Sequence, residues 1–373
     1  MAVRTRRMLL GLGLLGLLGL GLFLLRSRQS AAPVSSESQA PSSPNAGAAP
    51  VAAGREPSTS SGGQAPSSQP PSTSGTAKTA VMAEFAWGSG ESQLGRHRPQ
   101  EASPEAPMSM AADILGNVVV LDQINGRLVR LDPDGKVVAT FPMTQQTPQD
   151  LVMARDGSLL VLDRLKDRTV AILDPYNGSL RGELPVQGKG VPEPGLITAT
   201  FVDGDSVYVE REHGALIRIG DTSGKADPER PEVPGRPTRD GRSYVLARIT
   251  ERGSGRILLN SVDRQTGQHR YTREYPFGFP VMSITLLDSD LSGTLYLGLA
   301  GQLPAPTAAQ QAQPGVRVFC LEPLQGKVLG QVDLPLNTLP EETFRDFVVL
   351  DEGGLLYRHI TDSGVTLMRA HCR

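Results

Sequence analysis

"LVRLDPDGKVVATF", residues 128–141, consists of two apolar-alternating runs joined by Asp-Pro-Asp-Gly. The glycine of such a turn can take a positive φ, so the stretch predicts a β-hairpin. Related turns recur along the chain, and their glycines follow at intervals of 43, 46, 43 and 59 residues: Gly135, Gly178, Gly224, Gly267 and Gly326. This near-constant interval indicates that the chain is built from repeats.

A second series of Asp/Gly turns lies between the first. Its members are "LGN" (115–117), "RDGS" (155–158), "DGDS" (203–206), "RDGR" (239–242), "DLSG" (290–293) and "DEGG" (351–354). A short β run such as "VVVLD" or "LLVLD" follows each turn, and a third run leads into the next turn of the first series. Each period therefore holds four strands, and a period of about 40–50 residues with four strands is typical of a β-propeller blade. Six turns of the second series predict six blades.

The sixth period, which ends at Arg373, supplies only three strands. An unclosed ring would leave an open strand edge, so the missing strand must come from elsewhere. "AVMAEFAWG", residues 80–88, precedes blade one and places Val81, Ala83, Phe85 and Trp87 on one face. We expect it to pair antiparallel with residues 365–372 and to bury Phe85 and Trp87. The sequence thus predicts an all-β, six-bladed propeller over residues 80–373, closed by an N-terminal strand.

Residues 84–141 resemble an NHL-type repeat. They contain an aromatic- and Gly-rich lead, a Pro before an apolar strand, the pattern "G-N-x-x-V-x-D", and an Arg before a strand that ends in Asp-x-x-Gly. Residues 147–180 match almost as well, and the match weakens after Pro280, where residues 301–315 form an insert in blade five. The resemblance implies a propeller fold. It does not select a function, because NHL-type proteins include protein, RNA and glycan binders as well as hydrolases and lyases.

Residues 8–25 carry no charge over 18 positions, and arginines flank them at positions 4, 6, 7, 26 and 28. At about 1.5 Å per residue such a helix just spans a hydrocarbon core of about 30 Å. We expect a transmembrane signal-anchor at 8–25 after a basic cytoplasmic N-terminus at 1–7, with the remainder outside by the positive-inside rule. A cleaved secretory signal is the alternative, although "RSRQSAAP" (26–33) is a poor cleavage region.

Residues 26–79 are rich in Ser, Pro, Ala and Gly and nearly lack large apolar side chains. Such a segment cannot bury enough apolar surface to fold, so it predicts a disordered linker. Over roughly 50 residues, its r.m.s. reach is about 40 Å. The expected location is therefore a single-pass membrane protein with its propeller in the periplasm or at the cell surface.

Residues that could carry chemistry are few. The five histidines lack metal-ligand spacing, and the chain contains no G-x-S-x-G motif. Propeller hydrolases of the gluconolactonase type hold a divalent metal on the axis with Glu, Asp and Asn side chains. In this sequence the innermost strands offer Asp150 and Asp346 without a matching Asn. A metal-dependent lactonase- or esterase-like hydrolase is therefore the alternative, with these two acids as its candidate ligands, and otherwise we expect no catalytic residue, metal or cofactor.

Two repeated pairs, Asp122 with Arg127 and Asp163 with Arg168, end a second strand and open a third. We expect each to be a structural ion pair within its blade; acids that ring a metal or substrate are the alternative. Cys320 and Cys372 fall in the third strands of neighbouring blades. A disulfide between them would suit an exported protein, and two free thiols are the other possibility.

The formal net charge is −2, and no basic stripe is present, so nucleic acid is not an expected partner. The sequence favours a membrane-tethered, extracytoplasmic binding or scaffolding module for a protein or glycan partner.

Overall fold

The computed structural model describes residues 78–305 and 311–372. The expected membrane span at 8–25 and all but the last two residues of the expected linker lie outside these residues. Within the described part, no helix is long and apolar enough to cross a membrane. The helices assigned there are two short 3-10 turns, Gln123–Asn125 and Pro194–Leu196.

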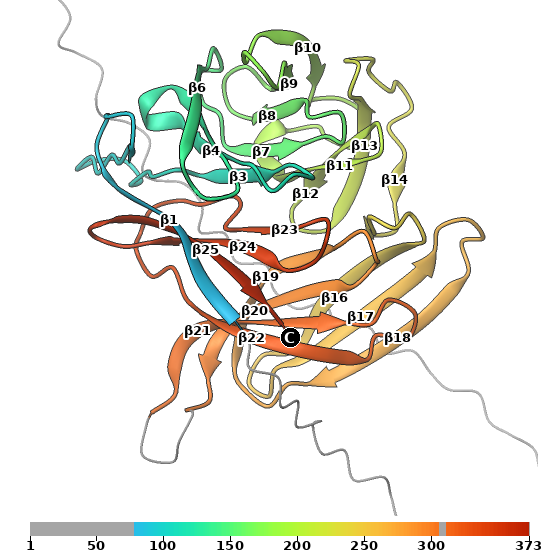
Figure 1. Ribbon diagram of the computed structural model, residues 1–373. Coiled ribbons are helices and arrows are strands. Elements are labelled where there is room, and N and C mark those ends of the chain that lie inside the picture. Colours follow the sequence, from blue (N-terminus) through green and yellow to red (C-terminus); the bar gives the residue numbers. More distant parts are fainter. Residues whose placement is uncertain (1–77, 306–310, 373) are drawn as a thin grey trace, which may run out of the picture. The chain divides into compact units, whose positions relative to one another are not determined.

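The strands form six sheets arranged around an axis (Figure 1). Blade one contains β3 (Ser109–Ala112), β4 (Val118–Asp122), β5 (Arg127–Leu131) and β6 (Val137–Pro142). Blade two contains β7 (Asp150–Met153), β8 (Leu159–Asp163), β9 (Thr169–Leu173) and β10 (Leu180–Pro185). Blade three contains β11 (Ile197–Asp203), β12 (Ser206–Arg211), β13 (Ala215–Asp221) and β14 (Glu232–Val233). Blade four contains β15 (Arg236–Pro237), β16 (Ser243–Glu251), β17 (Arg256–Asp263) and β18 (His269–Pro276). Blade five contains β19 (Val281–Ser289), β20 (Leu295–Leu303), β21 (Gln313–Leu321) and β22 (Val328–Pro335). Blade six contains β23 (Phe347–Val349), β24 (Leu355–Ile360), β25 (Gly364–His371) and β1 (Lys78–Trp87), extended by β2 (Gln93–Leu94). The predicted six-bladed propeller is confirmed.

The turn that decides the repeat forms as the sequence predicts. Leu128 of β5 pairs with Phe141 of β6, and Gly135 between them has φ = 85°. The Asp132 carboxylate accepts hydrogen bonds from the backbone N–H groups of Asp134 and Lys136, at 3.0 and 2.9 Å. The other four glycines of the series also have positive φ, which matches the recurrence of the turn.

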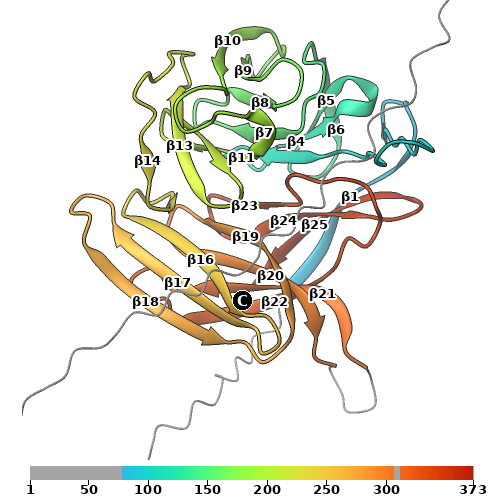
Figure 2. The same cartoon turned by 180° about the vertical axis from the view of Figure 1, so that it is seen from behind.

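The ring is closed by β1, which pairs antiparallel with β25 from Lys78 opposite His371 to Ala86 opposite Gly364. Figures 1 and 2 both show the blue β1 strand beside the red β25 strand. The predicted closure is therefore confirmed. Because β1 begins at Lys78, the predicted linker boundary at residue 79 lies two residues too late.

The predicted faces of β1 are only partly correct. Phe85 is 4% exposed and packs in the core between blades one and six, but Val81 is 59% exposed and Met82 packs against that core instead. The cause is a register shift between Val81 and Ala83, since a bulge moves the residues before it to the opposite face. Trp87 is half-buried, and its indole N–H donates to the Thr361 carbonyl at 3.1 Å.

The expected insert at 301–315 is largely a longer hairpin. β20 continues to Leu303, β21 begins at Gln313, and these two residues pair directly. The hairpin extends beyond the rest of its sheet (Figure 1).

Blade four departs from the other blades because its innermost strand, β15, has two residues while β16 has nine. The sequence explains this shortness. The segment before β16 reads "PERPEVPGRPT", and its four prolines, at 228, 231, 234 and 237, lack the N–H that a strand ladder needs. The inner edge of β16 is consequently left without a strand along most of its length.

Candidate functional site

The Asp122–Arg127 pair has a structural role. Asp122 is fully buried, and its carboxylate accepts hydrogen bonds from Arg127 Nε at 2.7 Å and from the Gly95 backbone N–H at 2.8 Å. Arg127 also donates to the Gly90 and Gln93 carbonyls at 2.8 and 2.7 Å. The pair therefore fastens the segment after β1 to blade one.

The prediction of an ion pair between Asp163 and Arg168 is wrong. Asp163 is buried, but its carboxylate accepts hydrogen bonds from Thr147 and from the backbone N–H groups of Leu165 and Lys166. Burial alone would raise the pKa of Asp163, and these hydrogen bonds outweigh it and lower the pKa below its ordinary value. Arg168 is exposed, in a left-handed turn conformation with φ = 57°. Local backbone donors have taken the place of the arginine.

We expect Asp163→Ala to lower the free energy of unfolding by about 1–3 kcal/mol, because three backbone N–H groups and the Thr147 hydroxyl lose their buried acceptor. Urea denaturation measures the change. Arg168→Ala, the matched control, should change stability by less than about 0.5 kcal/mol. Equal losses in the two variants would restore the ion-pair interpretation.

Asp150 and Asp346, the candidate metal ligands, are each held by an arginine. Asp150 is fully buried and accepts hydrogen bonds from Ser109 Oγ at 2.7 Å, from the Thr200 N–H at 2.8 Å, and from Arg345 Nη2 at 2.9 Å. Asp346 pairs with Arg358 at 2.5 Å. A divalent cation needs several oxygen ligands around one point, and the described residues contain no group of three His, Cys, Asp or Glu that could hold one. These residues do not fit the metal of gluconolactonase-type hydrolases.

Arg345, which the sequence reasoning missed, joins blades across the axis. It donates to Asp150 in blade two and to the Thr200 carbonyl in blade three, at 2.7 Å, and lies over the Phe201 ring at 5.4 Å. Burial would lower the pKa of Arg345, and the attraction of Asp150 outweighs it and raises the pKa. The sequence signal for it is the Arg-Asp dipeptide, residues 345–346, directly before the sixth inner strand.

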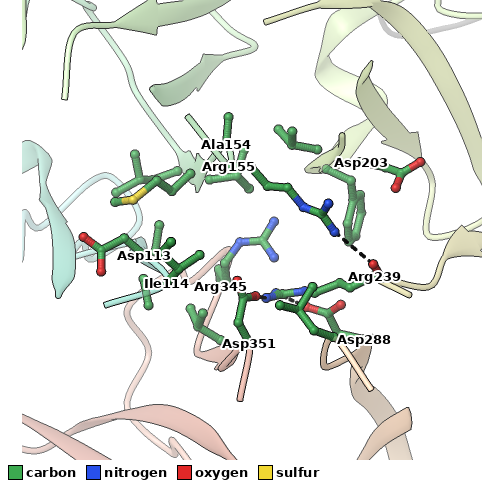
Figure 3. Close-up of a pocket in the computed structure, with 18 of the residues that line it drawn as sticks. Asp113, Ile114, Ala154, Arg155, Asp203, Arg239, Asp288, Arg345 and Asp351 are labelled. Atoms are coloured by element: carbon green, nitrogen blue, oxygen red, sulfur yellow. Dashed lines mark hydrogen bonds and ion pairs between the residues drawn. The ribbon is translucent and has the colours of Figure 1, made fainter. Parts of the chain in front are cut away.

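The axial pocket is a hollow of about 120 Å³ where the inner strands of all six blades end. Arg155, Arg239 and Arg345 converge on it from blades two, four and six (Figure 3). Asp288 and Asp351 pair with Arg239 at 2.9 and 2.7 Å. Arg155 donates to the Arg239 carbonyl at 3.0 Å and forms no ion pair with any residue in the described part of the chain. The pocket is thus small and largely charge-balanced.

The side cavity is a second, larger space of about 730 Å³, located where the inner strands begin. We define it by Leu246, Arg248 and Ile249 of β16, Met282 and Ile284 of β19, and Phe344 before β23. It occupies the place beside β16 where an inner strand would continue, because β15 pairs with Tyr244 and Val245 alone. The side cavity is therefore a product of the proline-rich segment.

Glu210 and Arg236 form one wall of the side cavity. The buried Glu210 carboxylate accepts hydrogen bonds from Arg236 Nε and Nη2 at 3.0 and 2.7 Å, and Arg236 lies over the Phe201 ring. Burial alone would raise the pKa of Glu210, but Arg236 and the neighbouring His213 outweigh it and lower the pKa from 4.5 to about 2. The pair fixes the short β15 strand against blade three.

This pKa predicts an acid-dependent stability. A depressed folded-state pKa contributes stability that is complete above pH 4.5 and is lost as the pH falls toward about 2. The full contribution is about 3 kcal/mol. We expect Glu210→Gln to be destabilised relative to the wild type at pH 6 and to approach it near pH 2, as measured by urea unfolding. A difference that is independent of pH would contradict the ion pair.

No protein-family model and no curated protein sequence matches the chain. Solved structures with a similar fold include hydrazine synthase of Kuenenia stuttgartiensis (16% identity, 70% of this chain and 76% of that chain, TM-score 0.43). A second is a streptogramin B lyase (11% identity, 79% of this chain and 98% of that chain, TM-score 0.42). A third is BamB from Moraxella catarrhalis (11% identity, 78% of this chain and 99% of that chain, TM-score 0.35). At these identities and scores, the similarities say nothing about the activity of this chain.

Proposed function

We propose that this protein is a membrane-tethered, extracytoplasmic binding module whose propeller takes a protein partner at the side cavity. One observation carries the proposal: a cavity of about 730 Å³ lies beside an unpaired strand edge. Its size falls within the range of about 300–1,000 Å³ that ligand pockets occupy. Sheet edges of this kind bind extended segments of other proteins through main-chain hydrogen bonds.

A protein partner is favoured over a glycan by the lining of the side cavity. Met282, Ile284 and Phe344 supply apolar surface, and β16 supplies backbone groups that a peptide can match. The hydrolase alternative is not supported, because Asp150 and Asp346 are each held by an arginine. Tethering rests on the apolar segment at 8–25 and the Ser/Pro-rich segment after it, and it is part of the proposal.

Affinity capture tests the proposal with the tagged full-length protein, solubilised from membranes of the cells that make it. A bulky side chain at the exposed Ser283, in the wall of the side cavity, should block the partner. We expect a protein that is recovered with the wild type and with Thr272→Trp, an exposed control on β18, but lost with Ser283→Trp.

Equal recovery with all three proteins would contradict binding at the side cavity. Full-length protein found in the soluble fraction without detergent would contradict the tether.

A further inference from the structure

We infer that the partner contributes an extended, acidic segment that pairs with the inner edge of β16 and completes blade four. This inference rests on the proposed function and specifies the chemistry of its ligand.

The backbone of β16 presents free hydrogen-bonding groups to the side cavity. Thr238 N–H donates to the Ser243 carbonyl at 2.9 Å, and Ser243 N–H donates to Thr238 Oγ1 at 3.0 Å, so the backbone groups of Ser243 face inward. The backbone N–H and C=O groups of successive residues in an antiparallel strand point alternately to its two edges. The register of β16 with β17 is unbroken from Ser243 to Ile249. The backbone groups of Ala247 and Ile249 therefore also face inward, and no backbone group of the described residues pairs with them there.

The free edge is long enough for a bound strand. Residues 246–251 of β16 extend beyond the two positions paired with β15. At about 3.4 Å per residue these six residues span roughly 20 Å, enough for a segment of five or six residues. In the other blades, an inner strand of three to nine residues fills the equivalent place. An unpaired edge of this length is a template for another chain.

Apolar side chains border the same edge. Met282 of β19 is 47% exposed, and Leu246, Ile249 and Ile284 are half-buried around the side cavity. A bound strand would place every second side chain on one face. One face of the segment should therefore be apolar.

The charged side chains in the lining of the side cavity indicate which residues the bound segment carries at its other, non-apolar positions. Arg248 and Arg252 are exposed in the lining, and neither forms an ion pair with a carboxylate in the described ranges. Each carboxylate that lines the cavity already pairs with an arginine: Glu210 with Arg236, Asp288 with Arg239 and Asp346 with Arg358. The unbalanced charge is positive, so complementarity favours Glu or Asp in the bound segment.

Labelled octapeptides test the inference by fluorescence anisotropy with the full-length protein in detergent. We expect a peptide of alternating Val and Glu to bind at least about tenfold more tightly than its Val/Lys counterpart, a difference of about 1.4 kcal/mol. The double variant Arg248→Glu with Arg252→Glu should reverse the preference. Arg273→Glu, an exposed control on β18 of the same blade, should leave it unchanged. No binding of the acidic peptide at about 1 mM, or one preference in all three proteins, would overturn the inference.

Backbone methylation tests the strand pairing itself. Two acidic peptides are N-methylated, one at the odd-numbered amides and the other at the even-numbered amides, so each has lost the N–H donors along one edge of its extended backbone. The peptide whose methyl groups face away from β16 should bind like the parent peptide, and the peptide whose methyl groups face β16 should lose binding. Equal binding of both peptides would refute pairing. If a natural partner is captured equally by the wild type and by the Arg248/Arg252 double variant, the inference fails and the proposed function stands; if no captured protein depends on Ser283, the proposed function fails.

Discussion

Deletion of residues 78–88 is expected to lower the free energy of unfolding of the propeller by about 5 kcal/mol or more. The deletion removes the partner strand of β25 and the buried Phe85 side chain, whose loss alone typically costs about 3–5 kcal/mol. It also leaves β25 as an open edge, so the variant should aggregate. Urea unfolding and light scattering measure the two effects.

A deletion of equal length at residues 60–70, in the Ser/Pro-rich segment, is the control and should leave stability unchanged. If the variant lacking residues 78–88 melts like the wild type and stays monomeric, β1 does not close the ring.

The second large effect is expected from the disulfide that joins Cys320 in β21 to Cys372, which follows β25. Both residues are buried in the core between blades five and six, and 52 positions separate them in sequence. Chain entropy for a loop of this length gives a stabilisation of about 4 kcal/mol. We expect Cys320→Ser with Cys372→Ser to lose this amount in urea unfolding.

Reduction of the wild type should produce the same loss, and the serine variant should be insensitive to the reductant. A wild type whose stability is unchanged by full reduction would mean that the crosslink contributes nothing to the fold. The disulfide links blade five to blade six, and the β1–β25 pairing completes blade six itself.

The fold could be predicted from the sequence because its signals are local. Turns such as Asp132–Gly135 and the alternation of the strands lie within a few residues of one another, and the count of strands required β1 to complete blade six. The bulge between Val81 and Ala83 was missed because apolar alternation alone does not reveal an extra residue in a strand. The partners of Asp163 were missed because Thr147 reaches it from a preceding loop.

The site was less predictable because its contacts cross the ring. Asp150 and Arg345 are 195 residues apart and meet only once the propeller closes. The side cavity had a sequence signal in the four prolines between residues 228 and 237, which cannot support a long inner strand. That signal predicts a short inner strand, but the cavity depends on the length of β16 and on the position of β19.

Photo-crosslinking in intact cells tests binding at the side cavity most directly. A photoreactive phenylalanine analogue replaces Met282 in the side cavity or, as the control, Leu165, which is 50% exposed between β8 and β9. We expect irradiation to join one partner protein to position 282 through an acidic, extended peptide and to give no such adduct at position 165. An adduct at position 165 with none at position 282 would contradict the account.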